Sequence, residues 1–271
     1  MRDGFVAPLG FTFVGADFDQ IHPRIIAHIW GIPRLLEAFE RGWDPYGCLA
    51  ERLFENRYRL ADGWGLDGFS RSRKPKAGKA GKLRALCKTL QLAAAYHAGV
   101  ATIAEQIWSI QDENGEPIFA DMSPSDIERL YEKWMKAEPE WERGWAGEIA
   151  AYEKQGYLRS LLFGRKSGSL KDGHLTDVCN YRTLASEADL ARRAEIRFIS
   201  RVPWGWEYDD MGRLTPYGLG IQLHDSLTAL VPNAVADEAL EALAESMEQP
   251  VPGFSVRFTA ERGRGHRWSD T

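Results

Sequence analysis

One stretch, residues 11–31 (FTFVGADFDQIHPRIIAHIWG), most limits what this chain can fold into. The apolar, β-rich run over residues 11–16 is fit for a buried strand. Pro23 and the apolar residues after it predict an amphipathic helix with proline in its first turn. Asp17 therefore stands where a strand ends and a helix is about to begin. A carboxylate there can hold a metal ion, although helix capping explains it too, because Asp is a favoured N-cap.

A second segment, residues 82–98, predicts a helix because it contains no internal proline or glycine. Four residues recur at every fourth position and so share one drifting stripe: Arg84, Lys88, Leu92 and Tyr96. The two cations lie in the N-terminal half, where the helix dipole also favours anions, so that end suits a triphosphate. A basic face turned to solvent explains the same pattern.

A third segment, residues 217–231, predicts a tight β-hairpin, because two short apolar runs flank His224, Asp225 and Ser226. An Asp at such a position often serves only the turn. The alternative is that Asp225 supplies a second carboxylate at the end of a strand.

Composition limits the class of protein. The 271 residues are 44% hydrophobic, which allows a proper core, and no 18-residue apolar run or signal-peptide core occurs. We therefore expect a globular, soluble, cytoplasmic protein without a membrane partner. The three cysteines have no metal-binding or disulfide spacing, so we expect them to be reduced.

Charge argues against a nonspecific DNA-coating protein, since the net charge is −5, but a nucleic-acid enzyme needs only a local basic surface. Residues 69–104 lack acidic side chains and carry a run of basic ones: Arg71, Arg73, Lys74, Lys76, Lys79, Lys82, Arg84 and Lys88. Residues 62–81 are also glycine-rich and predict a loop, so a solvated loop explains much of this run as well as phosphate binding does.

Together and in this order, the three segments resemble motifs A, B and C of the family A DNA polymerases, the bacterial DNA polymerase I type. Motif B is matched by the stripe on the predicted helix, and motif C by His224 and Asp225. Residues 252–270, with alternating Phe254, Val256 and Phe258 before Trp268, resemble the closing strand of the family. The resemblance covers nearly the whole chain. Motif A is matched by Asp17, Phe18, Gln20, Ile21 and Arg24.

The resemblance implies an α+β fold, in which a small antiparallel palm sheet carries an inserted, mainly α-helical fingers subdomain. Residues 1–41 would be palm with motif A, and residues 42–166 would be fingers with the motif B helix at 82–98. Residues 167–271 would return to the palm and carry the motif C hairpin at 217–231. The thumb and exonuclease of the family would be absent, leaving edges of the palm sheet uncovered.

The resemblance also implies a template-directed DNA polymerase that uses two Mg²⁺ ions. Asp17 and Asp225 would be the catalytic carboxylates that bridge the ions, with the main-chain carbonyl of Phe18 as a further ligand. The nucleotide-binding residues implied in this way are Gln20, His22, Tyr46, Arg84, Lys88, Leu92 and Tyr96. The DNA-binding residues are Arg24, Asn180, Asp189 and His224.

Some positions depart from the family pattern. His22 replaces a glutamate near the sugar, Ser226 replaces an acid after motif C, and Leu92 replaces an aromatic residue beside the sugar. Tyr46 stands where many members have a phosphate-contacting histidine, and Leu184 stands where a DNA-contacting glutamine is usual. None of these changes removes a metal-bridging carboxylate.

The expected partners are primer-template DNA, deoxynucleoside triphosphates and a separate chain that carries the thumb and exonuclease. The substitutions and length favour a phage-type protein, acting in the cytoplasm of a bacterial or phage-infected cell. A truncated gene is an alternative to the split enzyme. Two other functions stay open: a catalytically inactive DNA- or partner-binding remnant, and a metal-dependent nuclease that uses the same aspartates.

Overall fold

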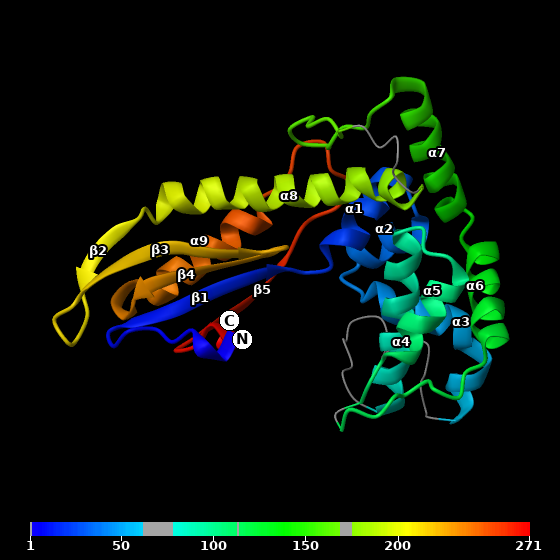
Figure 1. Cartoon of the computed structure of the whole chain (residues 1–271), viewed down its shortest axis with the longest axis horizontal. Helices are drawn as coiled ribbons and strands as arrows, with labels where there is room; N and C mark the ends of the chain where they lie inside the picture. Colours follow the sequence, from blue (N-terminus) through cyan, green and yellow to red (C-terminus); the bar gives the residue numbers. More distant parts are fainter. Residues whose placement is uncertain (1, 62–77, 113, 169–174) are drawn as a thin grey trace. The chain divides into compact units, whose positions relative to one another are not determined.

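The first apolar run forms strand β1 (Phe11–Phe18) in the computed structural model, which describes residues 2–61, 78–112, 114–168 and 175–271. The chain divides into two compact units. The first unit comprises Met1–Ile21, Leu161–Gly164 and Leu184–Thr271 and holds the sheet; the second comprises His22–Ser160 and Arg165–Thr183 and is helical. The predicted combination of helices with one antiparallel sheet is therefore confirmed (Figure 1).

The antiparallel sheet has the strand order β2-β3-β4-β1-β5 (Figure 1). The strands after β1 are β2 (Gly205–Tyr208), β3 (Leu214–Leu223), β4 (Ser226–Pro232) and β5 (Ala260–Gly265). Residues 224 and 225 join β3 to β4 in a hairpin that extends beyond the predicted range of 217–231. His224 has a φ of 54°, the left-handed conformation that a two-residue hairpin turn requires.

The two faces of the sheet are covered differently. Helix α9 (Ala236–Glu248) packs against β1, β4 and β5. On the other face, the C-terminal residue Thr271, which follows the 3₁₀ segment Trp268–Asp270, packs closely against Gly15. A Cβ built on Gly15 would lie only 2.5 Å from the Thr271 Cβ. Only a glycine allows so close an approach there. Asp17 lies two residues beyond Gly15 and therefore shares this face, opposite the α9 side.

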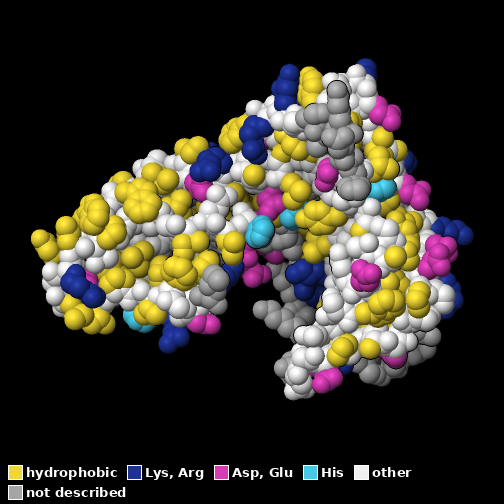
Figure 2. All heavy atoms as spheres, in the orientation of Figure 1, with side chains coloured by type: hydrophobic (Ala, Val, Ile, Leu, Met, Phe, Trp, Pro, Cys, Tyr) yellow, Lys and Arg dark blue, Asp and Glu magenta, His cyan; other side chains and the backbone are white. Residues whose placement is uncertain are grey.

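Strand β3 contains a bulge near its middle. Leu219 pairs with Ala229, whereas Ile221 pairs with Thr228, so Gly220 is an extra residue on this strand. Beyond the bulge, hydrophobic side chains gather over β2 and β3 at the end of the first unit (Figure 2). Trp206 and Tyr208 of the edge strand β2 are 66% and 69% exposed.

The closing strand β5 lies within the predicted stretch 252–270 but occupies only residues 260–265 of it. The alternating residues Phe254, Val256 and Phe258 precede β5 and fall outside the strands that the structure describes. Their alternation reflects packing, since Val256 and Phe258 are buried and the Phe258 ring lies 6.0 Å from the Phe18 ring. Backbone pairing with β1 begins only at Ala260.

The helices of the second unit follow β1 in the chain. They are α1 (Ile21–Trp30, whose first residue belongs to the first unit), α2 (Pro33–Glu40), α3 (Pro45–Ala61), α4 (Gly78–Ala95), α5 (Val100–Trp108), α6 (Pro124–Ala137) and α7 (Glu140–Gln155). Helix α8 (Leu175–Arg201) begins in the second unit and continues into the first. No helix in the described parts of the chain is long and apolar enough to cross a membrane.

The core of the second unit is built around a buried ion pair. Arg34 on α2 is paired with Glu138, which follows α6, and also donates to the carbonyl of Pro45 at 2.6 Å. The Nε1 groups of Trp134 and Trp141 donate to Glu138, each at 3.0 Å. Because both tryptophans are fully buried, this carboxylate satisfies two indole groups that water cannot reach.

Helix α4 differs from its predicted range of residues 82–98. It begins at Gly78, so the last four residues of the loop predicted over 62–81 are helical; residues 62–77 lie outside the described residues. The helix ends at Ala95, because Ala98 donates to the carbonyl of Ala93 at 3.0 Å and His97 has a φ of 52°. This is a Schellman ending with histidine in the left-handed position.

Candidate functional site

Two carboxylates meet where β1 and β4 run side by side in the first unit. Asp17 lies opposite Ser226 in the ladder, and Asp225 is the turn residue directly before Ser226. The backbone N–H of Phe18 donates to the carbonyl of Asp225 at 3.3 Å. The structure therefore places side by side the two acidic residues that the sequence analysis selected.

The carboxyl groups of Asp17 and Asp225 interact directly. Partial burial, the charge of Asp225 and a hydrogen bond between the two side chains raise the pKa of Asp17 to about 6. The charge of Glu261 adds to this rise, whereas that of Arg2 opposes it. Two carboxylates so close repel each other unless a proton or a cation lies between them.

The donor chemistry of this pair suits a hard divalent cation. Mg²⁺ prefers oxygen ligands and keeps several waters, so one or two carboxylates are enough to bind it. Within the described residues, no group of three or more His, Cys, Asp or Glu side chains could hold a metal ion. A cation here would therefore be held by Asp17 and Asp225, with the nearby carbonyl of Phe18 and water available for the remaining positions.

Glu261 is an acidic neighbour that the sequence analysis missed. It lies opposite Asp17 in the β1–β5 ladder, and it lines the same cavity of about 210 Å³ as Asp17 and Ser226. Strand alternation gives Glu261 the same face as Gly263 and Gly265. The resemblance assigned residues 252–270 to the closing strand as a whole and gave no role to Glu261.

In the second unit, Arg84 on α4 is held by Asp44, which precedes α3. The Nε and one terminal nitrogen of Arg84 donate to the Asp44 carboxylate at 2.8 and 2.9 Å. The guanidinium lies over the buried Tyr46 ring, 5.4 Å from its centroid. Asp44 also accepts from the N–H of Gly47 at 2.7 Å, and its side chain is only 1% exposed. The pairing of Asp44 with Arg84 was not predicted from the sequence.

The other residues of the predicted stripe lie further along the same helix. Lys88 is exposed and Leu92 is half-buried. Tyr96 lies one residue beyond the end of α4, and its hydroxyl lies 2.8 Å from Nε2 of His22 on α1. The two rings are tilted against each other with centroids 5.7 Å apart. His22 and Tyr96, both predicted to bind nucleotide, are therefore direct partners.

Residues predicted to contact DNA or nucleotide near β1 and the hairpin differ in exposure. Arg24 is buried at 7% exposure, and its guanidinium lies 4.4 Å from the centroid of the Phe39 ring. Gln20 is half-buried with a φ of 54°. His224 is exposed at the hairpin turn. Of these residues, His224 is the most open to a bound molecule.

The two predicted DNA contacts on α8 are buried and hydrogen-bonded within the chain. The side chain of Asn180 donates to the carbonyl of Tyr96 at 3.4 Å. The carboxylate of Asp189, in a residue that is 1% exposed, accepts from the N–H of Phe163 at 3.1 Å. In the structure described, both residues position the backbone of neighbouring segments.

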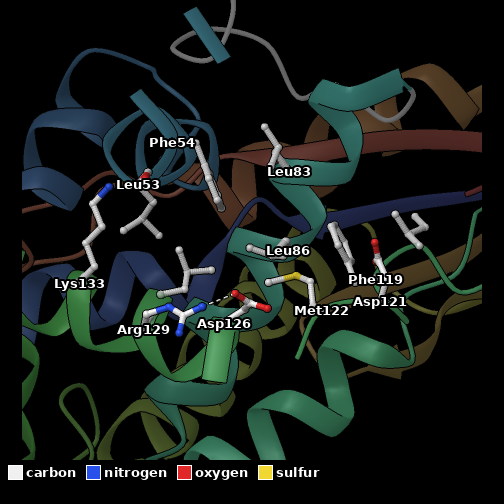
Figure 3. A pocket seen from close by; sticks show the side chains of 12 residues that line it. Leu53, Phe54, Leu83, Leu86, Phe119, Asp121, Met122, Asp126, Arg129 and Lys133 are labelled. Atoms are coloured by element: carbon white, nitrogen blue, oxygen red, sulfur yellow. Dashed lines mark hydrogen bonds and ion pairs between the residues drawn. The ribbon is translucent and has the colours of Figure 1, made fainter. Parts of the chain in front are cut away.

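A larger cavity of about 770 Å³ lies within the second unit (Figure 3). Its lining includes Leu83 and Leu86 of α4, together with Phe119 and Met122, and an Asp126–Arg129 ion pair lies at the same cavity. The residues that line it include none of the predicted site residues. This cavity is therefore separate from the candidate nucleotide-binding stripe.

Comparison with known proteins places the whole chain against one part of larger proteins. No protein-family model matches the chain. It is 23% identical to "DNA polymerase I, thermostable" of Thermus thermophilus over 99% of its own length and 28% of that protein. It is 24% identical to DNA polymerase I of Chloroflexus aurantiacus over 100% of its length and 25% of that protein. The chain thus spans about a quarter of the length of these relatives.

A solved structure shares the fold. The chain matches the structure described as the POL domain of Pol1 from M. smegmatis in complex with DNA primer-template and dNTP, with a TM-score of 0.73 and 20% identity. The match covers 99% of this chain and 42% of that one.

Proposed function

Because the chain belongs to the family A DNA polymerases and matches their C-terminal portion, we propose that it is the catalytic portion of a template-directed DNA polymerase. The observation that carries this proposal is the pair formed by Asp17 and Asp225 across β1 and β4. The reaction would add a deoxynucleotide to the 3′-hydroxyl of a primer.

Asp17 and Asp225 would hold two Mg²⁺ ions, together with the main-chain carbonyl of Phe18. The ions would supply activation of the primer 3′-hydroxyl and neutralisation of the triphosphate and the departing pyrophosphate. The role of the chain is to present two carboxylates from neighbouring strands in a fixed register. Burial and then the charge of Asp225 raise the pKa of Asp17, and the repulsion between the two carboxylates without a cation supports this role.

Arg84 and Lys88 would bind the phosphates of the incoming nucleotide. The bidentate contact with Asp44 uses Nε and one terminal nitrogen of Arg84, so the second terminal nitrogen is not part of that contact. A guanidinium fixed in this way loses little freedom on binding, which favours phosphate recognition. Lys88, one helical turn further on, would add an exposed charge.

The sugar and base would lie toward the other end of the stripe. We assign Gln20, His22, Tyr46, Leu92 and Tyr96 to the nucleotide, and Arg24, Asn180, Asp189 and His224 to the DNA. The hydrogen bond between His22 and Tyr96 supports a shared role at the sugar. The burial of Tyr46 favours a role through Arg84, whose guanidinium lies over the Tyr46 ring. Primer-template DNA and deoxynucleoside triphosphates are the proposed partners.

The test is primer extension on primed DNA with Mg²⁺ and all four deoxynucleotides, comparing the wild-type chain with Asp225→Asn. Asp177→Asn, on an exposed residue in the first turn of α8, is the matched control. We expect extension by the wild type and the control and none by Asp225→Asn. Measurements at low salt favour DNA binding and so give the chain its best chance of activity.

Other outcomes distinguish the remaining functions. Binding of primed DNA without extension by folded protein would support the inactive remnant. Strand cleavage that depends on Asp225 and needs no nucleotide would support the nuclease. The separate thumb-bearing chain stays a prediction; extension that begins only when such a chain is added would support it.

A further inference from the structure

Glu261 completes a row of three residues across β4, β1 and β5, the three strands at one edge of the sheet. Asp17 on β1 pairs with Ser226 on β4 and with Glu261 on β5. Directly opposite residues of antiparallel strands project to the same face, with Cβ atoms about 4.5–5.5 Å apart. The two cross-strand neighbours of Asp17 are therefore one neutral and one acidic residue on the face that also lines the small cavity.

This arrangement is unfavourable in the metal-free protein. Like charges placed directly opposite each other destabilise a sheet. The charge of Glu261 acts on Asp17 in the same direction as that of Asp225, while the charge of Arg2, which lines the same cavity, opposes them. With a divalent cation beside Asp17, the negative charges of Glu261 and Asp225 become favourable, because each carboxylate then attracts the cation.

We propose that Glu261 is a positioning residue for the divalent cations held by Asp17 and Asp225, and that its charge increases their affinity for this face of the sheet. The inference rests on the proposed function and adds a residue to its metal site. Glu261 would act through Asp17 and through cation-bound water, because it forms no three-residue metal cluster with the two aspartates among the described residues.

The test is a titration with Mn²⁺ alone, followed by electron paramagnetic resonance of the free ion. Glu261→Gln removes the charge and keeps the shape, Glu261→Asp keeps the charge, and Asp225→Asn identifies the binding that belongs to this site. Glu238→Gln, on an exposed residue of α9, is the control for loss of one negative charge.

We expect Glu261→Gln to weaken Mn²⁺ binding roughly three- to tenfold, as for the loss of one nearby charge near a protein surface. Glu261→Asp should recover at least half of the lost affinity on a logarithmic scale, and Glu238→Gln should bind as the wild type does. Without metal, Glu261→Gln should unfold at a higher temperature than the wild type, because one repulsion is gone. A purely structural residue would not give opposite effects on metal affinity and stability.

Equal Mn²⁺ affinity in Glu261→Gln and the wild type would overturn the role of Glu261, and wild-type primer extension would show that the proposed function survives. Absence of Asp225-dependent Mn²⁺ binding would also overturn it. Glu261-dependent Mn²⁺ binding without primer extension would support this inference while counting against the polymerase function.

Discussion

The hydroxyl of Tyr96 lies 2.8 Å from Nε2 of His22, which joins the residue just after α4 to the first turn of α1. Tyr96→Phe keeps the ring and removes this hydrogen bond. We expect it to lower the free energy of unfolding by about 0.5–1.5 kcal/mol, the usual net value of one hydrogen bond. Urea unfolding measures this change.

The same pair gives a prediction about substrate choice. His22→Ala removes the ring that packs beside Tyr96, and we expect the ratio of ribonucleotide to deoxynucleotide incorporation to rise. His28→Ala, near the end of the same helix, is the control. An unchanged ratio in His22→Ala would place the sugar elsewhere.

The raised pKa of Asp17 predicts a pH dependence of stability. The pKa is about 6 in the folded protein and 3.8 for an unperturbed Asp, so the metal-free fold takes up a proton more readily than the unfolded chain. The stability from this group is present below pH 3.8 and is lost as the pH rises through about 6. In EDTA, Asp17→Asn should therefore raise stability at pH 8, by less than about 1 kcal/mol because solvent screens the charge of this only partly buried side chain.

Thermal unfolding of the wild type and of Asp17→Asn at pH 5 and pH 8 tests the direction of this pH dependence. The difference between wild type and Asp17→Asn should be larger at pH 8 than at pH 5. Added Mg²⁺ should stabilise the wild type at pH 8 and leave the variant nearly unchanged. A larger difference at pH 5 would contradict the proposed repulsion.

Two glycines of α7 offer a matched pair of substitutions. A Cβ on Gly144 would lie 2.3–2.8 Å from ring atoms of Trp30, whereas a Cβ on Gly147 would meet nothing within 4 Å. Gly144→Ala should destabilise the protein by about 1–3 kcal/mol through overpacking. Gly147→Ala should stabilise it by up to about 1 kcal/mol, because alanine favours the helix. Chemical unfolding of the two variants side by side separates the effects.

Glu138 should be an acidic residue to which the stability of the second unit is strongly sensitive. Burial alone would raise the pKa of Glu138, but the charge of Arg34 and hydrogen bonds from Arg34, Trp134 and Trp141 outweigh it and hold the pKa below its ordinary value. Its stabilisation is present above about pH 4.5 and is lost as the pH falls through the lower folded-state pKa.

Glu138→Gln leaves Arg34 buried without its ionic partner and should cost about 3–5 kcal/mol. The comparison is Glu140→Gln, which removes a surface pair with Arg143 and should change stability by less than about 0.5 kcal/mol. Urea unfolding at pH 7 measures both variants. Similar losses in the two would contradict the central role of Glu138.

Substitutions of Asp44 and Lys88 should distinguish a residue that holds Arg84 in place from a residue that contacts the nucleotide directly. Asp44→Asn breaks the buried pair with Arg84 and should lower stability by about 3–5 kcal/mol while weakening deoxynucleotide binding. Lys88→Ala changes an exposed side chain and should weaken binding with a stability change below about 0.5 kcal/mol. Calorimetric titration with a triphosphate and thermal unfolding give the two readings.

Local rules placed each carboxylate at the end of a predicted strand, whereas the pairing of Asp17 with Asp225 was implied by the family resemblance. Alternation along β1 and a tight turn before β4 fix which residues end each strand, and the register of a hairpin follows from its turn. The contact between Asp17 and Asp225 itself depends on the pairing of β1 with β4, which are far apart in the sequence.

The remaining features depend on packing between distant segments. Asp44 looks like a turn residue until α4 brings Arg84 beside it, and Glu261 is unremarkable until β5 pairs with β1. The start of α4 was missed because glycine disfavours helices. The closing strand fills only the later part of the stretch predicted for it, because Val256 and Phe258 are buried in alternation in an irregular segment as residues of a strand are.

The bulge at Gly220 also determines which changes of chain length the sheet can absorb. Leu219 and Ile221 already pair with consecutive residues of β4, so deleting Gly220 would leave every partner and face unchanged. Deleting Ile221 instead would either give Gly220 a new partner on β4 or shift the register between β3 and β4 by one residue. Such a shift turns the side chains of β3 to the wrong face of the sheet. Melting temperatures of the two deletion variants should differ accordingly, and natural length variation in this hairpin is expected at Gly220 and nowhere between Ile221 and Asp225.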